Sequence, residues 1–243
     1  MEEILNVEYL NKSVVFFYQC YKQFKATEYV LARVRIFFPT NIIYLICDNG
    51  DDMSALATKY NCLYTYDVQK LDICNDKNLT GWNAEISMKW LNRIMQCIEI
   101  TGAKYIINLE DDVICYNKIT NLPVGDLNGV YDCPWAPNKF TDTFIDYLNS
   151  KGIKPKHDYY GACGGFIMNC EKFKMIMKNT TSDIIDDLRR LDSRIGDSSD
   201  CTITALFLIN KYTYEPWDDL KSKWDERAIS NYAFFHPDKH LYQ

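Results

Sequence analysis

The sequence lacks both a long uninterrupted apolar run and an excess of positive charge. No stretch of its 243 residues approaches the ~18–20 uncharged apolar residues that a membrane-spanning helix needs. Lysine and arginine number 27 against 33 aspartates and glutamates, so the formal net charge is −6. Nucleic-acid binding depends on cations that neutralise phosphates, and this balance argues against it. We therefore expect neither a membrane span nor a nucleic-acid partner.

Paired cysteine motifs are also absent, although the chain has 10 cysteines. No Cys-x-x-Cys pair occurs, which argues against a zinc ribbon or a thioredoxin-type centre. The first residues carry Glu2, Glu3 and Glu8 in place of the basic start and apolar stretch of a secretory signal. These features predict reduced cysteines and a cytoplasmic location.

Short β-branched and aromatic runs alternate with amphipathic segments through the first half of the chain. The predicted strands are residues 13–18, 42–47, 62–66 and 105–109, and the predicted helices are residues 27–38, 53–60 and 85–100. Repeated strand–helix–strand units indicate right-handed crossovers and a parallel sheet, so the predicted fold class is α/β. Ligands of such sheets bind beyond the carboxyl ends of the strands, where Gln19, Asp48 and Glu110 follow three of these runs.

The second half is less regular. Prolines interrupt it, and a Gly-rich segment at 161–165 precedes a further predicted strand at 166–168. Residues 200–211 have the pattern of a helix, and the charge-balanced residues 217–227 are typical of an exposed helix. Trp135, Trp217 and Trp224 are candidates for stacking on a ring of a ligand, for packing in the core or for anchoring at the surface.

Glu110, Asp111 and Asp112 directly follow a hydrophobic strand, which is the most informative feature of the sequence. Adjacent carboxylates repel one another, and a bound divalent cation would remove that repulsion. Because side chains alternate along a strand, Glu110 and Asp112 can face the same way. Carboxylate oxygens favour Mg²⁺ or Mn²⁺. A solvated acidic loop is the alternative interpretation.

A buried strand ending in Asp48-Asn49-Gly50, an amphipathic helix and a strand ending in an acidic cluster together resemble the nucleotide-sugar-dependent glycosyltransferases of the GT-A fold. The resemblance spans the chain from Ser13 to about His240 through short motifs, and the cluster is Glu-x-Asp where the family has Asp-x-Asp. It implies one GT-A, Rossmann-like domain over residues 1–243. In it, residues 13–116 bind the nucleotide sugar and residues 117–243 form an acceptor half with the C-terminal tail.

The resemblance also implies site residues. Asp112 matches the family's ligand for Mn²⁺ or Mg²⁺ on the donor diphosphate, and Glu110 matches the position that contacts the ribose or a metal-bound water. A C-terminal histidine often completes the family's metal site, and His236 fits this role better than His240, although a surface histidine is the simpler explanation. Donor-binding roles fall on Gln19, Asp48, Asn92, Arg93, Glu110, Asp111, Gly164 and Gly165. Asn92 and Arg93 could equally be surface polar residues, and the two glycines a simple turn.

An acidic residue at the start of the helix near residue 200 is the candidate general base. Asp200 matches the family position better than Asp197, but Ser199 stands where an acidic partner is expected. Ser198, Ser199 or Asp200 could instead cap the helix. An inverting reaction would need such a base, and a retaining reaction would not.

These observations predict a metal-dependent glycosyltransferase that moves a sugar from a nucleotide diphosphate donor, UDP-linked, to a hydroxyl of a glycan or glycoconjugate. A sugar nucleotidyltransferase is one alternative, but residues 18–23 lack the glycine-rich phosphate loop that such enzymes carry after the first strand. A non-catalytic nucleotide-sugar or carbohydrate-binding relative is the other alternative.

Overall fold

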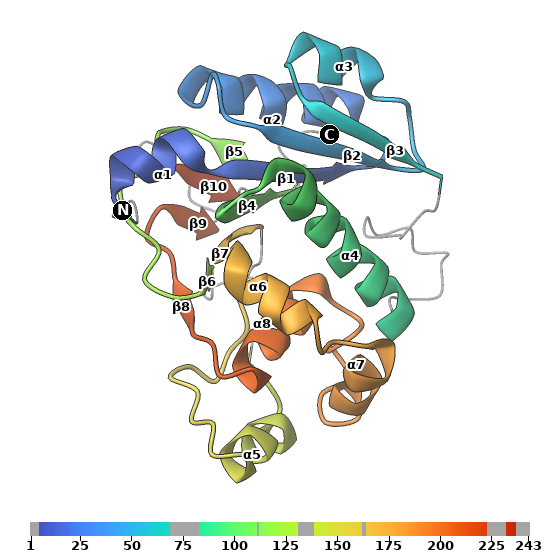
Figure 1. The fold of residues 1–243 in the computed structure, drawn as a ribbon, viewed down its shortest axis with the longest axis vertical. Helices are drawn as coiled ribbons and strands as arrows, with labels where there is room; N and C mark the ends of the chain where they lie inside the picture. The colour runs from blue at the N-terminus through green and yellow to red at the C-terminus, as the bar shows by residue number, and fades with distance from the viewer. Residues whose placement is uncertain are drawn as a thin grey trace.

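A mixed sheet with the strand order β3-β2-β1-β4-β7-β6-β8 forms the centre of the molecule, with helices on both faces (Figure 1). The structure is a computed structural model, and it describes residues 5–68, 83–110, 112–130, 139–161, 164–222 and 232–236. The strands of this sheet are β1 (Val15–Cys20), β2 (Ile43–Asp48), β3 (Leu63–Asp67), β4 (Tyr105–Leu109), β6 (Leu127–Gly129), β7 (Phe166–Asn169) and β8 (Tyr214–Pro216). β1 to β4 are parallel, β7 is antiparallel to β4 and β6, and β8 is parallel to β6. The predicted α/β class with a mostly parallel sheet is confirmed.

Helices connect most of these strands. They are α1 (Val7–Ser13), α2 (Phe24–Phe37), α3 (Ser54–Lys59), α4 (Ala84–Thr101), α5 (Asp142–Ser150), α6 (Cys170–Met177), α7 (Ser182–Arg189) and α8 (Ser199–Ile209). Across the described residues, no helix combines the length and the apolar character needed to cross a membrane.

The sheet separates two hydrophobic cores. Phe16 and Phe17 are adjacent in β1 and therefore point to opposite faces. Phe16 packs in the core that includes Val30 of α2, and Phe17 packs in the core that includes Trp90 of α4. Figure 1 shows α2 and α4 on opposite sides of β1. Burial on both faces explains why these strands are continuous apolar runs.

The parallel strands bring several polar residues to one edge of the sheet. β1, β2, β3 and β4 all end there, so Gln19, Asp48 and Glu110 lie at this carboxyl edge. β7 runs the opposite way, with Phe166 facing Asn108. The residues that lead into β7 therefore reach the same edge.

A second, smaller sheet brings the C-terminal segment to this edge. It has the order β5-β10-β9, from β5 (Ile114–Cys115), β10 (Phe234–His236) and β9 (Leu220–Ser222). β10 is antiparallel to β5 and pairs Phe235 with Ile114. The Phe234 ring anchors the strand, because its centroid lies 5.6 Å from that of Trp217 and 6.2 Å from that of Phe16.

The predicted helix over residues 217–227 is wrong for residues 217–222. Trp217 is buried, with its indole N–H donating to the carbonyl of Asn121 at 3.2 Å, and Leu220 begins β9. Pairing with β10 overrides the local charge pattern. The segment after Asp112, expected to be irregular, contains β5, β6 and α5, and α1 was not predicted. Trp135, Trp224, His240 and the rest of the predicted helix lie outside the described residues, and the division of the chain near residue 116 stays a prediction.

We predict that Asn83→Ala lowers the free energy of unfolding by about 1 kcal/mol. Asn83 is the N-cap of α4, and its side-chain oxygen accepts a hydrogen bond of 2.9 Å from the backbone N–H of Ile86. The substitution leaves that N–H without its cap. Urea unfolding measures the difference. Asn92→Ala is the matched control in the exposed interior of the same helix, and equal losses for the two variants would contradict the capping role.

Candidate functional site

Glu110, Asp112 and His236 form a cluster at the carboxyl edge of β4. Each of the three offers one ligand atom, and these atoms all lie within 4.8 Å of one another. His236 Nε2 lies 3.2 Å from Asp112 Oδ2. Asp112 and His236 are buried, whereas Glu110 is partly exposed. The structure thus brings together the three residues assigned to a metal site from the sequence.

The donor set suits a hard divalent cation. Two carboxylates and an imidazole are common ligands of Mn²⁺, and carboxylates are the usual protein ligands of Mg²⁺. An octahedral ion about 2.0–2.1 Å from each ligand holds neighbouring ligand atoms about 3 Å apart. The separation of 3.2 Å between His236 Nε2 and Asp112 Oδ2 matches this value. The same contact becomes an ion pair when the imidazole is protonated.

Two glycines pack closely against the segments that contain this cluster. Gly164 has a φ of +75°, and a Cβ added there would lie 2.4 Å from His236 Cγ. Gly165 has a φ of +111°, and an added Cβ would lie 2.5 Å from the backbone oxygen of Asn108 in β4. Neither position accommodates a larger residue without displacement. Gly164 and Gly165 are therefore not only part of a turn, because the absence of a side chain at Gly164 leaves room for the His236 ring.

Asp48 and Arg93 meet in a buried ion pair. Arg93 Nη1 lies 2.9 Å from Asp48 Oδ1, and both side chains are at most 5% exposed. The same guanidinium donates from Nη2 to Asp67 Oδ2 at 2.8 Å and from Nε to that oxygen at 3.1 Å. Asp48 and Asp67 are opposite each other in the β2–β3 register, so Arg93 of α4 joins the ends of two strands. Asp67, which directly follows a predicted strand, was not predicted as a site residue.

The remaining predicted donor-binding residues are dispersed. Asn92 is exposed on α4, next in sequence to the buried Arg93. Gln19 is near the end of β1, and its Oε1 atom is buried and accepts no hydrogen bond from the described residues. Asp111 lies outside the described residues. The structure therefore brings Asp48 and Arg93 into contact and leaves the donor-binding roles of all these residues as predictions.

The two candidate bases have different surroundings. Asp197 is exposed and paired with Arg189 of α7 at 2.6 Å. Asp200 is in the first turn of α8 and accepts a hydrogen bond of 3.0 Å from the hydroxyl of Ser199. Ser198, rather than either aspartate, is the N-cap of α8. Asp200 is therefore not needed as the cap.

A pair of cysteines beside the candidate donor residues was also missed. Cys20 and Cys47 are opposite each other in the β1–β2 register, and both are free and buried. A hydrogen bond with the Cys20 side chain lowers the pKa of Cys47 to about 7, although burial opposes this shift. Cys47 directly precedes Asp48. The cross-strand register is what pairs the two thiols, and spacing along the chain gives no sign of it.

Comparison with known proteins supports the architecture. No protein-family model and no curated protein matches the chain. A similar solved structure is that of the galactosyltransferase LgtC in complex with donor and acceptor sugar analogues. The TM-score is 0.56 at 12% sequence identity, over 92% of this chain and 87% of that chain. At this identity the likeness is one of fold, and it confirms a GT-A-like arrangement of the central sheet and its helices.

We predict that Arg93→Met lowers the free energy of unfolding by about 3–5 kcal/mol, because it removes the guanidinium that pairs with the buried Asp48 carboxylate. Lys89→Met is the matched control on the same helix. Lys89 pairs with Glu85 at 3.2 Å, but the two side chains are 41% and 73% exposed. We expect the control to lose less than about 1 kcal/mol in urea unfolding. Similar losses for the two variants would show that the buried pair does not hold the ends of β2 and β3 together.

Proposed function

We propose that the chain is a metal-dependent glycosyltransferase that moves a sugar from a UDP-linked donor to a hydroxyl of a glycan or glycoconjugate. The observation that carries this proposal is the cluster of Glu110, Asp112 and His236 at the carboxyl edge of a GT-A-like sheet. Ligands of parallel sheets bind at this edge. LgtC, which has a similar fold, was solved with donor and acceptor sugar analogues, and this supports looking for the same two ligand classes here.

In this proposal Asp112, Glu110 and His236 hold Mn²⁺ or Mg²⁺. The bound ion would stabilise the charge that develops on the departing diphosphate. Asp112 and His236 supply ligand atoms from buried positions, so the protein fixes their geometry before any ligand binds. The absence of a side chain at Gly164 leaves room for the imidazole.

The nucleoside is proposed to lie toward β1 and β2, near Gln19 and Asp48. The ion pair with Arg93 fixes the position of the Asp48 carboxylate at the end of β2 before a donor binds. The buried Oε1 of Gln19 is a candidate acceptor for a donor hydroxyl or base N–H. Gly164 and Gly165 are proposed to face the donor sugar, while Asn92 and Asp111 are assigned to the donor on the sequence alone.

Asp200 is the proposed base if the reaction inverts the anomeric centre. The Ser199 hydroxyl orients its carboxylate, whereas Asp197 is engaged by Arg189. A base that accepts the proton of the acceptor hydroxyl raises the rate by about 10²–10⁴-fold. A retaining reaction would proceed without this group.

The metal assignment is tested with Asp112→Asn. We expect the variant to lose more than about 100-fold in Mn²⁺ affinity and in Mn²⁺-dependent hydrolysis of a panel of UDP-sugars. Calorimetric titration of Mn²⁺ and the release of free sugar measure the two effects. Asp186→Asn, at an exposed position of α7, is the control and should match the wild type. Hydrolysis that persists in Asp112→Asn or in excess chelator would refute the metal assignment. Nucleotide-sugar binding without any hydrolysis would indicate a non-catalytic binding protein.

The role of Gly164 gives a second test. Gly164→Ala should displace the His236 ring and weaken Mn²⁺ binding about 10–100-fold, because the added Cβ would lie 2.4 Å from His236 Cγ. Gly102→Ala is the matched control, since Gly102 has a φ of +66° and nothing within 4 Å of an added Cβ. Both variants carry the strain of a left-handed alanine, about 1–2 kcal/mol. Equal Mn²⁺ affinities in calorimetric titration would mean that Gly164 does not position His236.

A further inference from the structure

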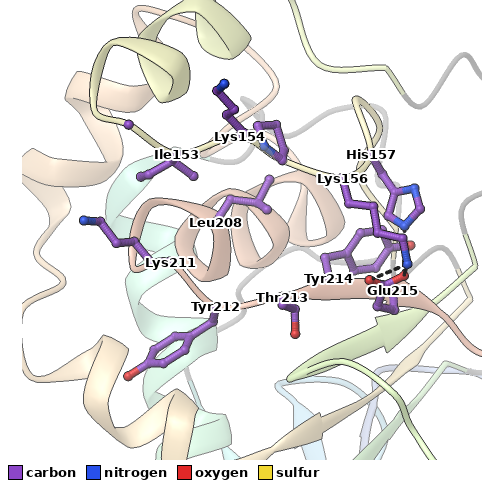
Figure 2. Close-up of a pocket in the computed structure, with 12 residues that line it drawn as sticks. Ile153, Lys154, Lys156, His157, Leu208, Lys211, Tyr212, Thr213, Tyr214 and Glu215 are labelled. Carbon is purple, nitrogen blue, oxygen red and sulfur yellow. Dashed lines mark hydrogen bonds and ion pairs between the residues drawn. The ribbon is translucent and has the colours of Figure 1, made fainter.

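A hollow lies in the C-terminal half, apart from the cluster of Glu110, Asp112 and His236. It is a cavity of about 320 Å³ between the loop that follows α5 and the segment that leads from α8 into β8 (Figure 2). Small-molecule pockets have volumes of about 300–1,000 Å³, so this one suits a small ligand group. We name it the basic pocket and define it by Ile153, Lys154, Lys156, His157, Leu208, Lys211 and Glu215.

The basic pocket has a charge opposite to that of the whole chain. Lys154, Lys156 and Lys211 line it together with one carboxylate, Glu215, whereas the chain has a net charge of −6. Lys156 Nζ lies 2.9 Å and 3.0 Å from the two oxygens of Glu215, and His157 Nε2 lies 2.9 Å from one of them. The carboxylate is therefore already compensated. Although burial opposes the shift, the hydrogen bonds from His157 and Lys156 hold the pKa of Glu215 below its usual value.

Lys154 and Lys211 supply the charge that is available to a ligand. Neither forms an ion pair with any residue that the structure describes. Figure 2 shows Lys211 toward one end of the pocket and Lys156, His157 and Glu215 toward the other, with Lys154 between them. The backbone oxygen of Leu208, near the end of α8, already accepts a hydrogen bond of 2.9 Å from the N–H of Lys211. An anion in the pocket would be attracted by both ammonium groups.

The walls of the pocket are suited to a sugar ring. Ile153, Leu208 and Tyr214 line it, and the partly exposed Ile153 offers apolar surface to ring C–H groups, whereas Leu208 and Tyr214 are at most 6% exposed. The Tyr214 ring packs edge-on to Tyr159 with centroids 6.2 Å apart, and this contact fixes its position. A ligand that combines an anionic group with a carbohydrate ring would match both the charge and the walls.

β8 runs from the basic pocket toward the carboxyl edge of the sheet. Tyr214 pairs with Leu127, and two residues further Pro216 pairs with Gly129, which faces Phe166 of β7. Two residues of strand span about 7 Å. The basic pocket therefore begins about two residues from this edge along β8, and β6 separates β8 from β7, which Gly164 precedes.

We propose that the basic pocket binds an acidic sugar, carrying a carboxylate or a phosphate, of the acceptor. This inference rests on the proposed glycosyltransferase function. Lys154 and Lys211 recognise the anionic group, and the apolar wall packs against the ring. A neutral acceptor would forgo both charge-assisted contacts, so the pocket selects for acidic acceptors.

The test measures direct binding of two acidic probes, a disaccharide ending in glucuronic acid and one ending in glucose 6-phosphate, by calorimetry with the full chain. The neutral disaccharide ending in glucose and inorganic phosphate are the reference ligands. We expect at least one acidic probe to bind about tenfold or more tighter than both references. The better probe distinguishes a carboxylate from a phosphate. Preference for neither acidic probe, or phosphate alone binding as tightly, would overturn the proposal.

Lys154→Gln combined with Lys211→Gln should reduce the preference for the acidic probe to less than about threefold. Lys118→Gln combined with Lys178→Gln removes the same charge at exposed positions outside the pocket and should leave the preference unchanged. A preference that survives the first pair, or falls equally with the second, would overturn the proposal. Mn²⁺-dependent hydrolysis of UDP-sugars, measured on the same samples, separates the two claims. Acidic-sugar binding without hydrolysis would refute the proposed glycosyltransferase function but not the role of the pocket. Hydrolysis without acidic-sugar binding would refute the role of the pocket but not the proposed function.

Discussion

Carboxylates that lie close together at the carboxyl edge of the sheet must be compensated by positive charge. The structure meets this constraint in two ways. Asp48 and Asp67 share the guanidinium of Arg93, which is always charged. Glu110 and Asp112 instead meet His236, whose imidazole is charged only when protonated. The first pair therefore has a permanent cation from the chain itself, and the second has the composition of a site for an external cation.

The contact of Glu110 and Asp112 with His236 depends on packing outside the cluster itself. His236 reaches Asp112 because β10 pairs with β5 and because the Phe234 ring is fixed between the Phe16 and Trp217 rings. Positioning β10 and assembling the cluster of Glu110, Asp112 and His236 are thus one structural event. Cation binding would in turn stabilise the attachment of β10, since a ligand that binds only the assembled site favours the assembled state.

The sequence predicted those elements whose pattern is local. The buried strands and α4 were recognisable from apolar periodicity, and the acidic cluster from its position after β4. β9 and β10 are three residues each and form only by pairing with each other and with β5, so local propensity predicted a helix around Trp217 instead. The contact of Gly164 with His236 and that of Arg93 with Asp67 join distant segments. A single sequence shows these residues but not which of them meet.

The cluster of Glu110, Asp112 and His236 and the basic pocket have opposite charge. In the proposed function, this difference would direct the two substrates to different positions on one sheet. The edge with Glu110 and Asp112 repels an acidic sugar unless a cation bound between them offsets the two carboxylates. The basic pocket at β8 attracts the same sugar. A donor diphosphate would be drawn to the cation, and an acidic acceptor to Lys154 and Lys211, so neither substrate would compete strongly for the position of the other. Because β8 and β7 belong to one continuous sheet, the separation between the two positions is fixed by strand register rather than by a flexible linker.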